Sequence, residues 1–249
     1  MGYETKVDWC DSTWNPVAGC LHGCDYCYAR KIAERFSTEE KNKKTYISVL
    51  DVPIRRVRTK PEPYPYGFKP TFHRYKLDAP QRWKKPRNVF VCNMADLFGD
   101  WVPDEWIEQV FEACKKAPQH RYLFLTKNPT RYCKMADAGW LPDEKNFWYG
   151  STITRKGDSF FAGSIHWNAF VSIEPLLEPL DVGIGSFGGA KWAIIGAETG
   201  NRKGKITPKR EWVENIVDAT QITDVKVFMK ESLREIMGDD FRQEFPWEK

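Results

Sequence analysis

Long apolar runs are missing from this 249-residue sequence. No stretch reaches the ~18 apolar residues that a membrane span requires, and residues 1–8 contain no apolar run of the signal-peptide type. We therefore expect no membrane association and a cytoplasmic location. Internal repeats and low-complexity tracts are also missing, and the hydrophobic fraction of 41% is enough for a sizeable core. The seven cysteines are an odd number, which disfavours a framework of disulfides.

Three of these cysteines lie close together in the sequence. Cys20, Cys24 and Cys27 have the spacing C-x3-C-x2-C, and Gly19 and Gly23 allow the backbone to wrap tightly. Thiolates this close would repel one another unless zinc or an iron–sulfur cluster neutralised them. A structural zinc site is usually closed by four protein ligands. Three ligands on a four-iron cluster leave one iron open.

A closed zinc site is the main alternative, with His22 or Cys10 as the fourth ligand. The spacing disfavours it, because His22 lies inside the loop and no second C-x2-C pair occurs downstream. The same absence predicts one cluster only. Incidental thiols are the third interpretation. The remaining cysteines need no special role, since Cys92, Cys114 and Cys133 lie in strand-like or helical patterns where small apolar residues are expected.

The cysteine spacing, with Tyr26 just before the last cysteine, resembles the signature of the radical S-adenosylmethionine (SAM) superfamily. The resemblance implies that Cys20, Cys24 and Cys27 hold a [4Fe–4S] cluster. It also implies that SAM binds the fourth iron and that Tyr26 lies against its adenine. An external electron donor would reduce the cluster. SAM would then be cleaved to methionine and a 5′-deoxyadenosyl radical that takes hydrogen from a substrate.

Apolar patterns predict a short strand or an extended entry over residues 13–17 and a helix over 28–36, on either side of the cysteine loop. From residue 88 onward, short apolar runs alternate with helical patterns. The expected strands cover residues 89–93, 122–126, 147–153, 168–173, 191–196 and 225–229, and the expected helices cover 103–116, 128–139 and 208–219. This alternation predicts an α/β fold, an incomplete (β/α)6–7 TIM-like barrel of parallel strands in a single domain over residues 1–249.

A basic insertion, residues 37–87, follows the first helix. Its prolines disfavour long regular elements. Between Arg55 and Arg87, eleven Lys and Arg face only Glu62 and Asp78, so the net charge is +9 and the rest of the chain carries −5. Interleaved aromatic residues suit phosphate contact and base stacking, although a solvated connection with aromatics packed beneath it is equally consistent. The candidate substrate contacts are Arg74, Lys84, Lys85 and Arg87.

Polar residues end most of the expected strands. In barrels, the carboxyl ends of the strands carry the active site. A helix cap or a loop residue is the simpler interpretation for any single one, but the repetition at equivalent places favours a site. The residues are Asn93, Asp96, Lys127, Ser151, Thr152, Ser172, Glu174, Glu198, Thr199 and Lys230.

The superfamily resemblance implies roles for these strand ends. Residues 93–96 stand where the superfamily usually has Gly-Gly-Glu. The implied cofactor contacts are Asn93 and Asp96 to the SAM amino group, Ser151 and Thr152 to its ribose or carboxylate, and Glu198 to its adenosine. The implied catalytic residues, which would meet substrate, a carboxylate or a phosphate, are Glu174, Glu198, Lys127 and Lys230.

The chain as a whole resembles an uncharacterised family of phage- and prophage-associated three-cysteine proteins. The matching stretches are residues 14–16 with the cysteine loop, 89–103, 123–129, 172–177 and 194–201. That family supplies no substrate, but it implies a bacterial or phage-infected cell.

These observations lead to an enzyme hypothesis. We expect a radical SAM enzyme acting on a nucleotide or a modified nucleic-acid base. A peptide or a partner protein is the alternative substrate. A zinc-containing nucleic-acid-binding module without catalysis and a simple electron carrier are hypotheses of other classes.

Overall fold

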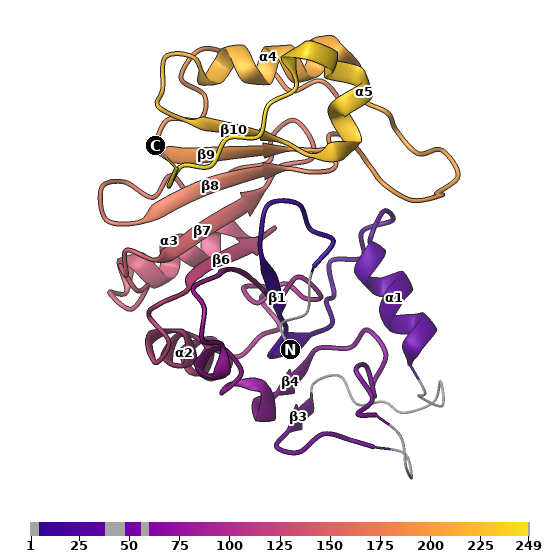
Figure 1. Ribbon diagram of the computed structural model, residues 1–249, viewed down its shortest axis with the longest axis vertical. Coiled ribbons are helices and arrows are strands. Elements are labelled where there is room, and N and C mark those ends of the chain that lie inside the picture. Colours follow the sequence, from indigo (N-terminus) through magenta and orange to yellow (C-terminus); the bar gives the residue numbers. More distant parts are fainter. Residues whose placement is uncertain (1–4, 38–47, 56–59, 249) are drawn as a thin grey trace. The chain divides into compact units, whose positions relative to one another are not determined.

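The computed structural model describes residues 5–37, 48–55 and 60–248 (Figure 1). The chain divides into two compact units. The first contains Met1–Thr5 and Cys10–Leu125, and the second contains Lys6–Trp9 and Thr126–Lys249. The single domain expected over residues 1–249 stays a prediction.

Seven parallel strands form the main sheet, and all six strands expected after residue 88 are among them. The strands are β1 (Ser12–Trp14), β5 (Asn88–Val91), β6 (Arg121–Thr126), β7 (Phe147–Thr152), β8 (Asn168–Ile173), β9 (Ala190–Ile195) and β10 (Lys226–Met229). Their order in the sheet follows the chain, β1-β5-β6-β7-β8-β9-β10. Every residue of β7 is buried, as in a parallel sheet covered on both faces. The predicted α/β partial barrel is confirmed.

Helices follow most of these strands. They are α1 (Tyr28–Phe36), α2 (Asp104–Lys115), α3 (Pro129–Asp137), α4 (Arg210–Thr220) and the short α5 (Arg234–Met237). Single 3-10 turns cover Arg74–Lys76, Pro80–Arg82, Glu231–Leu233 and Gly238–Asp240. Two crossovers lack a helix, since residues 153–167 and 174–189, all described, form only turns and extended chain. The strand–helix repeat is therefore incomplete in the second unit.

The short strand or extended entry expected over residues 13–17 is divided between two strands, β1 and the short β2 (Val17–Ala18), because the chain breaks at Pro16. Proline has no N–H for a ladder, and its carbonyl instead accepts a hydrogen bond from the His73 N–H at 2.7 Å. The chain then leaves the main sheet and joins a small second sheet that the sequence did not indicate. Its order is β2 (Val17–Ala18), β4 (Thr71–His73) and β3 (Ser48–Leu50).

Each unit has apolar side chains at its centre. In the second unit, residues of β8, β9 and β10 pack with one face of α4, including Val213 and Ile216, which are fully buried. In the first unit, α2 buries six residues, among them Ile107 and Phe111. No helix in the described ranges has the length and apolar character to span a bilayer.

Candidate functional site

The cysteine loop leaves β2 and ends where α1 begins, so two short elements of the first unit hold its ends. Gly19 has φ +90°, and a Cβ there would lie 2.2 Å from the Lys69 carbonyl oxygen. Only glycine fits such a position. The loop backbone is also fixed by hydrogen bonds from the Gly19 N–H to the Met94 carbonyl, 2.9 Å, and from the Cys20 N–H to the Phe68 carbonyl, 3.1 Å.

The three thiols of this loop are half-buried and form no disulfide. The Cys27 Sγ accepts a hydrogen bond from the Arg30 N–H at 3.3 Å, so this ligand also caps α1. The Cys27 N–H donates to the Cys24 carbonyl at 3.2 Å, which closes a tight turn between two of the thiols.

Burial raises the pKa of the Cys20 thiol to about 12. A hydrogen bond from the His22 backbone opposes this shift, whereas the negative charges of Asp96, Cys27 and Cys24 add to it. A Cys20 thiolate would therefore be repelled by the charges of Asp96 and of the other two thiolates. A metal group that carries positive charge would relieve this repulsion and displace the protons, so the three residues fit a cluster. In the described ranges, no three His, Cys, Asp or Glu side chains surround a point that suits a single metal ion.

Asp96 braces the cysteine loop from the segment after β5. Its Oδ2 lies 2.7 Å from His22 Nε2, and its Oδ1 accepts a hydrogen bond from the Phe98 N–H at 3.0 Å. The His22 ring also meets Trp101 edge-on, with centroids 4.8 Å apart. Asp96 is only 5% exposed. The histidine considered as a zinc ligand is thus bonded to a carboxylate, and a direct contact of Asp96 with SAM stays a prediction.

Asn93 and Met94, in the segment after β5, form hydrogen bonds with residues on both sides of the cysteine loop. The Asn15 Nδ2 donates to the Asn93 Oδ1 at 2.7 Å, and the Met94 N–H donates to the Asn15 Oδ1 at 2.9 Å. The Tyr28 hydroxyl donates to the Asn93 carbonyl at 3.0 Å. Tyr26 is half-buried in the loop itself. Sequence reasoning assigned no role to Asn15 or Tyr28, although Asn15 lies in one of the stretches on which the resemblance to the three-cysteine family rests.

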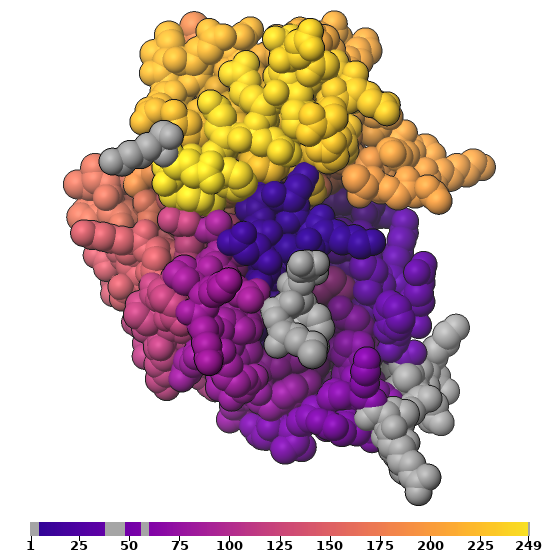
Figure 2. All heavy atoms as spheres, viewed as in Figure 1, coloured from indigo at the N-terminus to yellow at the C-terminus, as the bar shows by residue number. Residues whose placement is uncertain are grey.

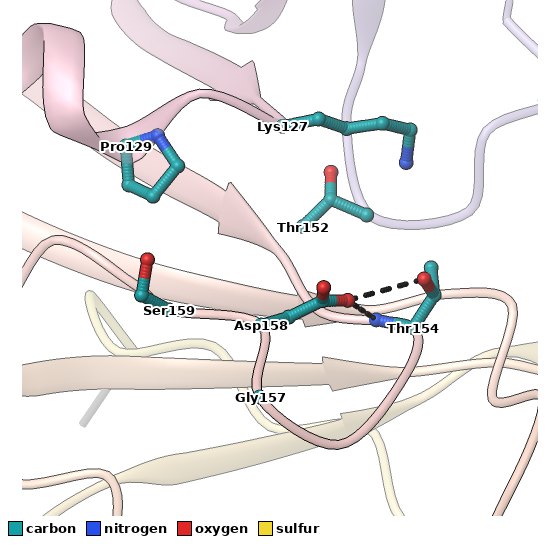
Figure 3. Close-up of a pocket in the computed structure, with 7 residues that line it drawn as sticks. All are labelled: Lys127, Pro129, Thr152, Thr154, Gly157, Asp158 and Ser159. Carbon is teal, nitrogen blue, oxygen red and sulfur yellow. Dashed lines mark hydrogen bonds between the residues drawn. The ribbon is translucent and has the colours of Figure 1, made fainter. Parts of the chain in front are cut away.

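A polar pocket of about 240 Å3 lies in the second unit, at the ends of β6 and β7 (Figure 3). Lys127 and Thr152, two of the strand-end residues that the sequence suggests for the site, line it. The far wall is the turn after β7, where the Asp158 Oδ2 accepts hydrogen bonds from the Thr154 N–H, 2.7 Å, and the Thr154 hydroxyl, 3.2 Å. Ser151 has other surroundings than Thr152. It is fully buried, and its hydroxyl accepts a hydrogen bond from the Phe161 N–H.

Glu174 and Lys230 meet at the ends of β8 and β10. The Lys230 Nζ lies 2.5 Å from the Glu174 Oε1 and 3.9 Å from the Asp8 Oδ1. The three side chains are between 17% and 25% exposed. Gly196 gives them room, since a Cβ there would lie 2.9 Å from the Lys230 Cδ and 3.2 Å from the Glu174 Cγ. Two of the four expected catalytic residues are therefore brought together.

Glu198 is 3% exposed and is held by Arg202 through two hydrogen bonds, of 2.6 and 2.7 Å. This pairing is the main reason why the pKa of Glu198 is lowered, and the Ile206 N–H adds to the effect. The pair closes the loop over residues 199–205, on which Lys203 and Lys205 are exposed. Glu198 thus anchors a basic loop whose position sequence reasoning missed.

The four candidates of the basic insertion have different surroundings. Arg74 pairs with Asp51 at 3.0 Å, in an exposed ion pair. Arg87 donates to the Ser12 hydroxyl at 2.6 Å and lies over the Trp83 ring, so it supports the fold. Lys84 and Lys85 are exposed. Residues 38–47 and 56–59 of the insertion lie outside the described residues.

Fold and site together define a partial β/α barrel with a braced loop of three thiols in its first unit. The chain belongs to a family of proteins of unknown function, DUF5131, whose model matches residues 4–236. No protein in the curated collection matches it.

Two solved structures are similar to this chain. Spore photoproduct lyase complexed with dinucleoside spore photoproduct is 10% identical, with a TM-score of 0.52 over 92% of this chain and 79% of that one. A cysteine-to-alanine mutant of the lyase, with the same dinucleoside, is 12% identical, with a TM-score of 0.45 over 98% of this chain and 65% of that one. At such identity the first likeness supports the fold alone.

Proposed function

We propose that this protein is a radical SAM enzyme whose [4Fe–4S] cluster is held by Cys20, Cys24 and Cys27. The observation that carries the proposal is the tight loop, fixed at Gly19, that carries three half-buried thiols without a disulfide. When bound and reduced, the cluster would supply the electron that cleaves SAM to methionine and a 5′-deoxyadenosyl radical.

The residues around the loop would orient this chemistry. Tyr26 would lie against the adenine of SAM, and Asn93 and Asp96 would bind its amino group or fix the loop that does so. The His22–Asp96 bond and the Asn15–Asn93 bond hold that part of the first unit rigid, which is what a bound cofactor requires for correct positioning.

The second unit offers groups for anions and for a polar substrate. The pocket lined by Lys127 and Thr152 suits a carboxylate or a phosphate, because an ammonium and a hydroxyl both donate hydrogen bonds. Glu174 and Lys230 would share a proton or offer hydrogen-bonding groups to a substrate. Ser151 and Glu198 would act by positioning, since their side chains bond to the Phe161 N–H and to Arg202.

A nucleotide or a nucleic-acid base is the substrate we propose. The exposed Lys84 and Lys85 suit phosphate contact. The neighbour with the similar fold is complexed with a dinucleoside, which supports the same substrate class here. A peptide or a partner protein is the second candidate substrate. Arg74 and Arg87 already bond to groups of this chain, which leaves fewer basic side chains for contact with phosphate.

Anaerobic reconstitution tests the reaction class. The protein should bind about four irons and form 5′-deoxyadenosine from SAM when dithionite is added. A colourless protein that binds about one zinc and forms no 5′-deoxyadenosine would show that the cysteines form a closed zinc site.

Binding to nucleic acid tests the substrate class. Lys84→Glu with Lys85→Glu should weaken binding of a short single-stranded DNA or RNA and reduce the salt dependence of the affinity. The matched control is Lys115→Glu with Lys116→Glu, another adjacent, exposed pair in the first unit. Equal weakening by both double variants would mean non-specific charge attraction. No binding at low salt would favour the peptide.

A further inference from the structure

Helix α1 has an apolar face that the described structure covers only in part. Its apolar residues lie at two adjacent stripes with a spacing of four, which places each stripe along one line of the helix surface. Ala29 and Ala33 form the first stripe and are 5% and 0% exposed. The second stripe consists of the larger residues Tyr28, Ile32 and Phe36, which are 49%, 36% and 56% exposed.

This second stripe, which we call the α1 ridge, places three large apolar side chains along one line of the helix surface. Single exposed apolar side chains are normal on a protein surface, whereas contiguous ones mark an interaction site. Leu21, in the cysteine loop itself, is 51% exposed and adds a further apolar side chain near the start of the helix. Figure 1 shows α1 at the edge of its unit, and atoms of the same indigo-to-purple colours form part of the surface in Figure 2.

Basic residues flank the ridge. Lys31 and Arg35 are exposed on α1, and Arg30 lies over the Phe68 ring at 5.8 Å from its centroid. Glu34 is the one acidic residue among the nine of α1, all of which are described. The helix therefore presents an apolar ridge with a positive rim, which is complementary to a negatively charged protein surface.

The ridge starts at the cluster ligands. Cys27 is the N-cap of α1, and a helix rises 1.5 Å per residue, so Ile32 lies about 7 Å and Phe36 about 13 Å along the axis from that cysteine. Because electron transfer slows steeply with distance, a donor must approach this end of the first unit. A protein docked on α1 would be next to a cluster ligand.

We propose that the α1 ridge, formed by Tyr28, Ile32 and Phe36 with Lys31 and Arg35 beside it, docks an acidic protein that carries one electron. The donor would be oxidised by one electron and the cluster reduced by the same electron. The inference rests on the proposed function, since it assumes a cluster on the three cysteines.

Two reductants separate docking from chemistry. Dithionite is small and needs no docking surface, whereas reduced flavodoxin, an acidic flavin protein, serves as the protein donor. In Ile32→Asp with Phe36→Asp, and in Lys31→Glu with Arg35→Glu, flavodoxin-supported formation of 5′-deoxyadenosine should fall about tenfold or more. The dithionite-supported rate and the iron content should stay within about twofold of the wild type, because no ligand is changed.

Ile184→Asp with Ile222→Asp is the matched control, because both residues are exposed, 70% and 72%, and lie in the second unit. This variant should keep both rates. A direct titration with oxidised flavodoxin gives a readout without catalysis, and the ridge variants should bind it about tenfold more weakly.

Three results would overturn the inference. The first is an equal loss of the flavodoxin-supported rate in the ridge variants and in the control. The second is binding of flavodoxin by the ridge variants as tight as by the wild type, and the third is loss of the flavodoxin-supported and dithionite-supported rates together. If dithionite forms no 5′-deoxyadenosine in the wild type, the proposed function is wrong, and the titration still decides whether the ridge binds an acidic protein.

Discussion

The cysteine loop of the first unit and the strand ends of the second unit both contain candidate site residues. They differ in whether the charges of these residues are balanced by other side chains of the protein. In the loop, burial raises the pKa of the Cys20 thiol, and the nearby charges of Asp96, Cys27 and Cys24 add to this shift. At the strand ends, Glu174 pairs with Lys230 and Glu198 pairs with Arg202. Negative charges that lie close together require a positively charged group from outside the chain to neutralise them. Ion pairs between side chains are already neutral and need no such group. The loop therefore indicates a cofactor, and the strand ends indicate positioning of a ligand.

The largest effect should come from Cys24→Ala, which removes one of the three proposed cluster ligands. We expect loss of most of the iron and of all measurable 5′-deoxyadenosine formation. Iron analysis and the dithionite assay check this. Cys133→Ala is the control, because Cys133 is exposed on α3 and lies outside the loop. Retention of iron in Cys24→Ala would remove the contrast between the two regions.

Gly19→Ala should have the next largest effect. The added Cβ would lie 2.2 Å from the Lys69 carbonyl oxygen at a φ of +90°, so the loop must move at a cost of about 3 kcal/mol. Gly23→Ala meets nothing within 4 Å and should cost only about 1 kcal/mol, from its positive φ. Urea unfolding and iron loading of the two variants provide the test. Equal losses would show that the loop is not fixed at Gly19.

Lys230→Met tests the second region. The substitution leaves Glu174 and Asp8 without their cation in a site that is about three-quarters buried or more, which should lower the free energy of unfolding by about 2 kcal/mol. Combining it with Glu174→Gln should recover part of this loss. Iron content should not change. A loss of iron in Lys230→Met would contradict the separation of cofactor and scaffold residues.

His73, in the small sheet that carries the cysteine loop, should give the smallest effect at neutral pH, because its contribution changes only in acid. Burial lowers the pKa of His73 to about 3, and the Lys76 charge adds to this shift. Between pH 6.5 and 3 only the unfolded chain binds the proton, so stability is complete above pH 6.5 and falls as the pH is lowered. The slope from this group is about 1.4 kcal/mol per pH unit. His73→Phe should flatten the slope in urea unfolding from pH 4 to 7, and an unchanged slope would contradict the neutral, buried state.

The sequence predicts the elements with long, distinct patterns. The apolar runs of β6 to β9 and the helical spacing of α1 and α2 correspond to elements that the structure contains. The cysteine loop is predicted from spacing alone, because cysteines that share one loop are close in sequence. The second sheet was missed, since β2 and β3 have only two and three residues and no periodicity.

For the candidate site, the sequence indicates which residues take part better than it indicates which partners they contact. Glu198 and Lys230 are predicted because polar residues end apolar strands. The pairing of Glu198 with Arg202, and of Lys230 with Glu174 and Asp8, depends on loop geometry that no local pattern encodes. Similarly, the exposure of Ile32 and Phe36 reverses the usual meaning of a helical apolar stripe. Local periodicity identifies an apolar face without showing what covers it.

The electron paramagnetic resonance spectrum of the reduced protein, recorded without and with SAM, tests the central claim most directly. Three cysteine ligands leave one iron open, so binding of SAM at that iron should change the spectrum of the reduced cluster. We predict a cluster signal that shifts on addition of SAM in the wild type and is lost in Cys24→Ala. A protein without a cluster signal, or a signal that SAM leaves unchanged, would contradict the assignment.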